Sequence, residues 1–249
     1  MFVAASLECF PELSLADAVQ KMIDLEYSAI ELDLHEDGHI PPSKIHENLE
    51  WGLKTCQDVM RLEVVGYSVD IKAEGEAYFE QFESICKIAK ATKVVTLSVP
   101  SSPLGTPFNE EVERLKRLVE IADTKGVRVA VKGEIGCLTE DPDTVKVICE
   151  HIEGLGLLLD PSHYLCGPYS NRDIEPLMKY TFQVHLRDST DKKLQVRIGQ
   201  GVIDFGKVIN QLRKVGYNRS LCADFHPVEG VDHMSEMRTF RLLMESLLL

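Results

Sequence analysis

Acidic and imidazole side chains stand at a two-residue spacing along one apolar segment, residues 28–34, and just beyond its end. Glu31, Asp33 and His35 alternate there with aliphatic residues, and in a β-strand this alternation puts all three on one face. Burying two carboxylates without a cation or hydrogen-bond donors carries a large desolvation cost. The spacing therefore predicts a polar site into which these side chains point.

Four later strand-like segments end in groups of the same kinds. Residues two apart share a face of their strand, so the members of such a pair point to the same side. Carboxylates and imidazoles gathered in this way suit proton transfer or the binding of a divalent metal. The residues are Lys132 and Glu134, Asp160 with His163 in the turn after it, His185 and Arg187, and Asp224 and His226.

Single members of this set also have structural explanations. Asp160 precedes Pro-Ser, a sequence in which Asp commonly forms a turn. His185 lies between Val and Leu and by itself suits a hydrogen-bonded core histidine. Asp188 and Asp204 are expected to be structural, with Asp204 capping a helix that begins at Phe205. Acid or imidazole groups at five strand ends nevertheless favour a functional site.

Short β-branched segments alternate with longer amphipathic ones, which predicts a single (β/α)₈ TIM barrel over residues 1–249. A doubly wound sheet is the alternative, but the chain has neither GxGxxG nor GxxxxGK[ST]. In a barrel the strand ends meet at one mouth, so the residues named above would converge. The expected strands are 2–6, 28–34, 62–69, 93–99, 126–132, 154–160, 180–186 and 219–225, and the expected helices are 14–26, 43–60, 75–91, 109–125, 141–152, 172–178, 204–215 and 233–248.

The 249 residues include 40 Asp and Glu against 27 Lys and Arg, a net charge of −13. A negative protein repels phosphate backbones and anionic lipid surfaces, so we expect neither nucleic acid nor a membrane as a partner. No apolar run approaches the ~20 residues of a transmembrane helix, and the N-terminus lacks the basic start of a signal peptide. The 7 cysteines are scattered singly, as reduced thiols are, which favours a cytoplasmic location.

The order of the motifs resembles the xylose isomerase-like superfamily of TIM barrels, and within it the sugar phosphate isomerase/epimerase group. The motifs are DxxH at 160–163, HxRD at 185–188, GxGxxDF at 199–205 and an acid at the last strand end. The resemblance implies one divalent ion (Mn, Mg or Zn) held by a Glu, an Asp, a His and a Glu, which stabilises the enediolate of an open-chain sugar or sugar phosphate. Asp160 and His185 match two of these ligands, and His163 matches a histidine that contacts substrate or a ligand.

Two positions depart from that pattern. Asp224 stands where the last Glu is expected, and Lys132 stands where the first is expected, with Glu134 two residues later. Three outcomes stay open. The Lys132 ammonium neutralises the carboxylates and the protein is metal-free, or Glu134 joins Asp160, His185 and Asp224 as the metal ligands. In the third, a desolvated Lys132 with a lowered pKa acts as a base or Schiff-base nucleophile.

The residues are assigned roles on this basis. If the protein is an enzyme, we expect Asp224 to be the base on one face of the substrate and His163 or Lys132 the acid on the other. Substrate contacts are expected from Arg187, which suits a phosphate or carboxylate, and from Glu31 and His226. The alternatives are a metal-free barrel that binds a small polar ligand and, remotely, DNA repair like that of endonuclease IV, which the net charge disfavours. The resemblance is the only basis for expecting a homo-oligomer.

Overall fold

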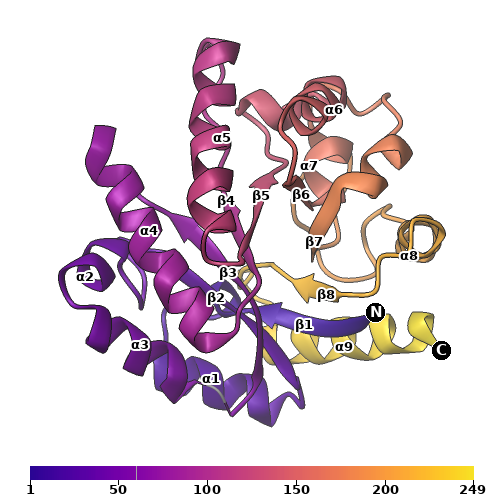
Figure 1. Cartoon of the computed structure of the whole chain (residues 1–249). Helices are drawn as coiled ribbons and strands as arrows, with labels where there is room; N and C mark the ends of the chain where they lie inside the picture. The colour runs from indigo at the N-terminus through magenta and orange to yellow at the C-terminus, as the bar shows by residue number, and fades with distance from the viewer. Residues whose placement is uncertain (60) are drawn as a thin grey trace.

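Eight parallel strands close into a barrel in the computed structural model, which describes residues 1–59 and 61–249 (Figure 1). Each strand pairs with the next along the chain, and the last pairs with the first. The (β/α)₈ prediction is thereby confirmed. The strands are β1 Phe2–Ser6, β2 Ala29–His35, β3 Glu63–Asp70, β4 Thr96–Val99, β5 Arg128–Lys132, β6 Leu155–Leu159, β7 Thr181–Leu186 and β8 Ser220–Ala223.

Helices surround the barrel, and Figure 1 shows the last of them, α9, alongside β1. The α-helices are α1 Leu15–Asp24, α2 Pro42–Glu47, α3 Leu49–Asp58, α4 Gly75–Thr92, α5 Phe108–Asp123, α6 Pro142–His151, α7 Pro161–Cys166, α8 Phe205–Lys214 and α9 His233–Leu248. Three 3₁₀ helices, η1 Leu7–Cys9, η2 Leu138–Glu140 and η3 Glu175–Tyr180, lie between these elements.

Two expected helices differ from the structure. The helix expected over 43–60, whose last residue lies outside the described part, is divided at Asn48, whose side chain accepts a hydrogen bond from the Trp51 N–H at 2.9 Å and caps α3. The helix expected over 172–178 is wrong. The segment GPYSNRD at 167–173 is rich in turn-forming residues, and regular structure resumes only in the 3₁₀ helix η3.

The alternation along β2 is confirmed. Ile30 and Leu32 are fully buried and belong to the apolar core. Glu31, between them, is also fully buried, but its carboxylate contacts His185 on β7, across the barrel. The barrel interior near its mouth is therefore polar, and β2 contributes to both environments.

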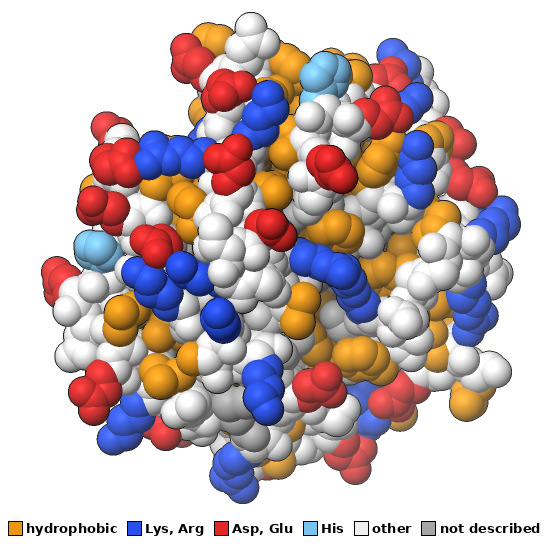
Figure 2. All heavy atoms as spheres, viewed as in Figure 1, with side chains coloured by type: hydrophobic (Ala, Val, Ile, Leu, Met, Phe, Trp, Pro, Cys, Tyr) orange, Lys and Arg blue, Asp and Glu red, His pale blue; other side chains and the backbone are white. Residues whose placement is uncertain are grey.

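The surface of the molecule carries charged side chains of both signs (Figure 2). Acidic and basic side chains are interspersed on the face of the molecule that Figure 2 shows, rather than gathered by sign. None of the described helices combines the length and hydropathy needed to cross a bilayer. The cysteines all have free thiols. The cytoplasmic location stays a prediction.

Asp188 organises the segment after β7, in the structural role that we expected for it. It is 2% exposed. Its Oδ2 accepts hydrogen bonds from the N–H groups of Gly199 and Gly201 at 2.8 and 2.9 Å. Asp204, farther along, caps α8 as expected, because it accepts the Lys207 N–H at 2.8 Å. The GxGxxDF segment is thus held by two structural carboxylates.

Gly201→Ala should lower the free energy of unfolding by about 1–3 kcal/mol, the usual cost of overpacking. A Cβ atom at this position would overlap the Asp188 carboxylate and lie 2.6 Å from the Ser189 carbonyl oxygen. Urea unfolding followed by circular dichroism measures the change. Gly206→Ala is the control, since its Cβ atom would meet nothing nearer than 3.4 Å and the residue lies within helix α8, where alanine is favourable. Equal stability of the Gly201→Ala variant and the wild type would contradict the role given to Asp188.

Candidate functional site

The polar strand ends meet around a cavity of about 210 Å³ at the mouth of the barrel. A larger cavity of about 570 Å³ adjoins it, because Glu8 and His226 line both. Eight of the nine residues assigned catalytic, substrate-binding or metal-binding roles line the smaller cavity, and the ninth, Glu31, contacts His185, which does. The smaller cavity is lined by Glu8, Lys132, Gly133, Glu134, Leu158, Asp160, His163, His185, Arg187, Leu194, Asp224 and His226.

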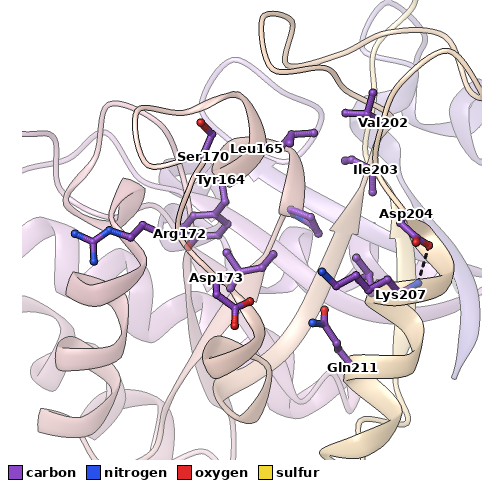
Figure 3. A pocket seen from close by; sticks show the side chains of 13 residues that line it. Tyr164, Leu165, Ser170, Arg172, Asp173, Val202, Ile203, Asp204, Lys207 and Gln211 are labelled. Carbon is purple, nitrogen blue, oxygen red and sulfur yellow. Dashed lines mark hydrogen bonds between the residues drawn. The ribbon is translucent and has the colours of Figure 1, made fainter.

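A separate cavity of about 250 Å³ lies between the segment after β6 and helix α8 (Figure 3). Its charged side chains serve structural contacts. Arg172 pairs with Asp143 at 2.5 Å, and Asp204 caps α8 through the hydrogen bond that Figure 3 marks. None of the predicted site residues lines it. The residues predicted to act in the site therefore lie elsewhere, at the mouth of the barrel.

His185 is bound between two carboxylates at the centre of the mouth. Its Nε2 lies 2.7 Å from Glu31 Oε1, and its Nδ1 lies 3.0 Å from Asp224 Oδ2. Burial by itself would lower the pKa of His185, but the charges of Glu31 and Asp224 outweigh it and raise that pKa well above its usual range. His185 is accordingly an imidazolium at neutral pH, with both ring nitrogens donating.

Arg187 bridges the tips of β6 and β8. Its Nε and Nη2 lie 3.0 and 2.9 Å from Asp160 Oδ2, and Nη2 also lies 2.5 Å from Asp224 Oδ2. Burial opposes the charged form of the guanidinium, but the two carboxylates raise the pKa of Arg187 further. The same contact with Arg187 and the one with His185 hold the pKa of Asp224 well below its usual range against the effect of burial. Arg187 thus neutralises the pair of carboxylates for which Lys132 or a metal was expected.

Lys132 contacts a hydroxyl rather than a carboxylate. Its Nζ donates to Ser68 Oγ at 2.9 Å, and it forms no ion pair within 4.0 Å in the described part of the chain. Burial disfavours the charged form, but the nearby charges of Glu8 and Glu31 outweigh it and raise the pKa of Lys132. This shift is opposite in direction to the lowered pKa expected if Lys132 were a base or a Schiff-base nucleophile. Lys132 presents a stable ammonium.

His163 is the neutral member of the site. The Ile135 N–H donates to its Nδ1 at 3.1 Å, so the ring proton lies on Nε2, 3.8 Å from Asp160 Oδ2. Burial is the main reason that the pKa of His163 is lowered. Asp160 also accepts the Ser162 N–H at 2.9 Å and caps α7. Asp160 therefore both caps a helix, as its Pro-Ser context suggested, and lines the smaller cavity.

Glu134 and His226 complete the wall of the smaller cavity. The Glu134 carboxylate is half-buried and has no hydrogen-bond or ion-pair partner among residues 1–59 and 61–249. His226 is exposed at the rim, where the Gln195 side chain holds its backbone: the His226 N–H donates to Gln195 Oε1 at 2.9 Å. An unpaired carboxylate thus lines the same cavity as three cationic groups.

Glu8 is a site residue that the sequence analysis missed. Its Oε1 lies 2.7 Å from His35 Nδ1, and its backbone N–H donates to Asp33 Oδ2 at 2.9 Å. Ser6 Oγ donates to the same oxygen at 2.9 Å. Burial, with the neighbouring charges of Glu8 and Glu31, raises the pKa of Asp33 well above its usual range. Glu8 follows the end of the first strand, so the rule used for the other strands would have identified it.

Two groups of three residues bring donor atoms within 4.8 Å of one another, as a metal site requires. These are Glu31, His185 and Cys222, and Glu8, Asp33 and His35. The four-residue set implied by the family resemblance is not one of them within the described chain.

The ends of β6, β7 and β8 do not fit a divalent ion in this arrangement. Both ring nitrogens of His185 donate to carboxylates, and the guanidinium of Arg187 lies between Asp160 and Asp224. An ion there would have to displace a cation and a proton.

The chain is similar to known TIM barrels over nearly its whole length. The family model described as xylose isomerase-like TIM barrel matches residues 19–238. A D-tagatose 3-epimerase-like protein is 17% identical, with a TM-score of 0.77 and coverage of 100% of this chain and 97% of the other. An L-ribulose 3-epimerase is 14% identical, with a TM-score of 0.75 and coverage of 100% and 95%. The IOLI protein with a bound zinc atom is 15% identical, with a TM-score of 0.76 and coverage of 99% and 98%. No curated protein matches the sequence.

Asp224→Asn should lower the pKa of His185, because it removes one of the two carboxylates that stabilise the imidazolium. Long-range ¹H–¹⁵N NMR of the ring should show both nitrogens protonated in the wild type at pH 7. In the variant, the ring should lose one of these protons at a lower pH than it does in the wild type. His185 has a raised folded-state pKa, so its stabilisation is complete below about pH 6.5 and is lost as the pH rises through the folded value.

Asp191→Asn is the control for this measurement, since it makes the same charge change at an exposed position. It should leave the ring resonances of His185 unchanged. A neutral His185 ring in the wild type at pH 7 would contradict the doubly bound imidazolium.

Proposed function

Because this chain belongs to the xylose isomerase-like TIM barrel family, we propose that it is an isomerase or epimerase of a small sugar or sugar phosphate. The reaction is a proton transfer at a carbon next to a carbonyl group. The observation that carries the proposal is the unpaired Glu134 carboxylate, which lines one cavity with Lys132 and Arg187. A carboxylate can take the proton there, and the cations can stabilise the negative charge that then develops on oxygen.

The proposed steps use the residues as they are charged in the structure. Glu134 takes a proton from the carbon next to the carbonyl, and the electron pair of the C–H bond moves to the carbonyl oxygen to give an enediolate. Lys132 and the Nη1 group of Arg187, which has no partner among the described residues, stabilise that oxygen. Return of the proton by Glu134 to the neighbouring carbon, while the hydroxyl proton passes from one oxygen to the other, completes an isomerisation. In an epimerisation the Lys132 ammonium donates a proton to the opposite face of the same carbon, and Glu134 keeps the proton that it took.

The other predicted residues have supporting roles in this proposal. The lowered pKa of Asp224 makes it a weak base, so we assign it to holding Arg187 and His185 in place. His163, which is neutral, donates from Nε2 to a substrate oxygen. Glu31 is too deeply buried for substrate and holds His185 instead. His226, at the rim, remains a proposed substrate contact.

A second candidate function is a barrel that binds a small polar ligand without turnover. The observation that favours it is the ion pairing of Arg187 with both Asp160 and Asp224. These two residues stand at positions that the family resemblance assigned to metal ligands. A divalent ion takes no part in the proton transfer proposed here. Proton exchange with solvent distinguishes the two functions, because only an enolising enzyme replaces the substrate hydrogen.

The test is incubation of the protein in D₂O with a panel of aldoses, ketoses and their phosphates, followed by ¹H NMR. We expect deuterium to replace the hydrogen on the carbon next to the carbonyl of at least one substrate. Glu134→Gln should slow this exchange by about 100-fold or more, because it removes the base. Lys132→Met should slow it by about 100-fold through the loss of enediolate stabilisation.

Glu153→Gln, at an exposed position, should leave the exchange rate unchanged. Binding of a sugar without exchange would support the ligand-binding barrel instead. Exchange that is intact in the Glu134→Gln variant would overturn the assignment of the base.

A further inference from the structure

We propose that Glu8, Asp33 and His35 form a divalent-cation site at the mouth of the barrel, on the β1–β2 side. This site is separate from the strand ends of β6, β7 and β8, where Arg187 lies. It goes beyond the proposed function, because none of the proton-transfer steps uses it. The chemistry of the donors, two carboxylates and one imidazole, suits Mn²⁺ or Zn²⁺.

The first observation is the geometry of the three side chains. One donor atom from each lies within 4.8 Å of the other two, a spacing that a single ion can bridge after small side-chain rotations. Glu8 Oε1 and His35 Nδ1 already lie 2.7 Å apart. The donors come from the end of β2 and from η1, directly after β1, and the parallel pairing of Ser6 with Glu31 fixes these two elements relative to each other.

The second observation is an orphaned oxygen. Asp33 is 7% exposed and lines the larger cavity, but its Oδ1 has no hydrogen-bond partner among the described residues. Its other oxygen, Oδ2, accepts hydrogen bonds from Ser6 and from the Glu8 backbone, so the carboxylate is held in a fixed orientation. Buried polar atoms are nearly always paired in folded proteins, and an unpaired one needs an explanation. A bound cation would supply it.

The third observation is access. The side chains of Glu8 and His35 are 30% and 23% exposed, and the cavity of about 570 Å³ leaves room for water or substrate as further ligands. The group of Glu31, His185 and Cys222 differs in this respect, because all three are buried and both nitrogens of His185 are engaged. The cationic side chains of His185 and Arg187 thus lie on the buried β6–β8 side of the mouth. A metal ion from solvent can reach Glu8, Asp33 and His35 through the larger cavity.

The test is titration of the full-length, chelator-treated protein with MnCl₂ and with ZnCl₂ by isothermal titration calorimetry. A crystal soaked in MnCl₂ then locates the ion by anomalous difference density. We expect one equivalent of metal and a density peak among Glu8, Asp33 and His35. Glu8→Gln and His35→Gln should each weaken binding at least tenfold.

Asp37→Asn is the matched control, because Asp37 lines the same cavity at an exposed position outside the donor group. Asp160→Asn is the control for the other side of the mouth. Both should bind metal within twofold of the wild type. A peak beside Asp160 and Asp224, a tenfold loss in the Asp160→Asn variant, or no binding at millimolar metal would overturn the proposal. If either donor variant is unfolded by circular dichroism, the position of the wild-type peak decides.

Discussion

The contact of the Arg187 guanidinium with Asp160 and Asp224 is the interaction on which the rest of the site depends. Both carboxylates are buried at strand tips, where a charge without a partner carries a large desolvation cost. Removing one member of such a buried group generally costs about 3–5 kcal/mol, because the remaining charge is left unpaired. The pairing also decides which carboxylates are available for chemistry. Asp224 is held in its ionised form and is a weak base, whereas Glu134 is left unpaired.

Charges of opposite sign alternate from one side of the barrel mouth to the other. Glu31 binds His185, His185 binds Asp224, Asp224 binds Arg187, and Arg187 binds Asp160. The carboxylates in this series stabilise the charged forms of His185 and Arg187, and these two cations in turn lower the pKa of Asp224. Lys132 lies outside this chain of contacts, on the hydroxyl of Ser68, and so keeps an ammonium that no carboxylate within 4.0 Å neutralises directly.

The sequence predicted which side chains gather at the mouth, because inward or outward orientation follows from alternation along a single strand. It could not predict which cation meets which carboxylate. Arg187 shares a face with His185 by spacing, but its contact with Asp160 and Asp224 depends on side-chain rotamers and on the register of three strands. The ammonium of Lys132, the more conspicuous departure in sequence, has Ser68 as its one hydrogen-bond partner among the described residues. The helix expected over 172–178 failed for a local reason, the run of turn-forming residues before it.

The two departures from the family pattern have one physical consequence in common. Asp224 keeps the charge of the Glu expected there but is one methylene shorter, which withdraws that charge from the position of the implied ion. Lys132 brings a positive charge where a second Glu was expected. The shorter side chain of Asp224 leaves more room, and the missing Glu leaves less negative charge. The guanidinium of Arg187, which is larger than a metal ion and cannot dissociate from the chain, lies there instead. Among the described residues at the mouth, the carboxylate oxygens without a partner include those of Glu134, Asp33 Oδ1 and the more deeply buried Glu31 Oε2. Arg187 lies at the ends of β6, β7 and β8, so the groups that we propose to take a proton and to bind an exchangeable cation lie on the other side of the mouth, after β5 and along β2.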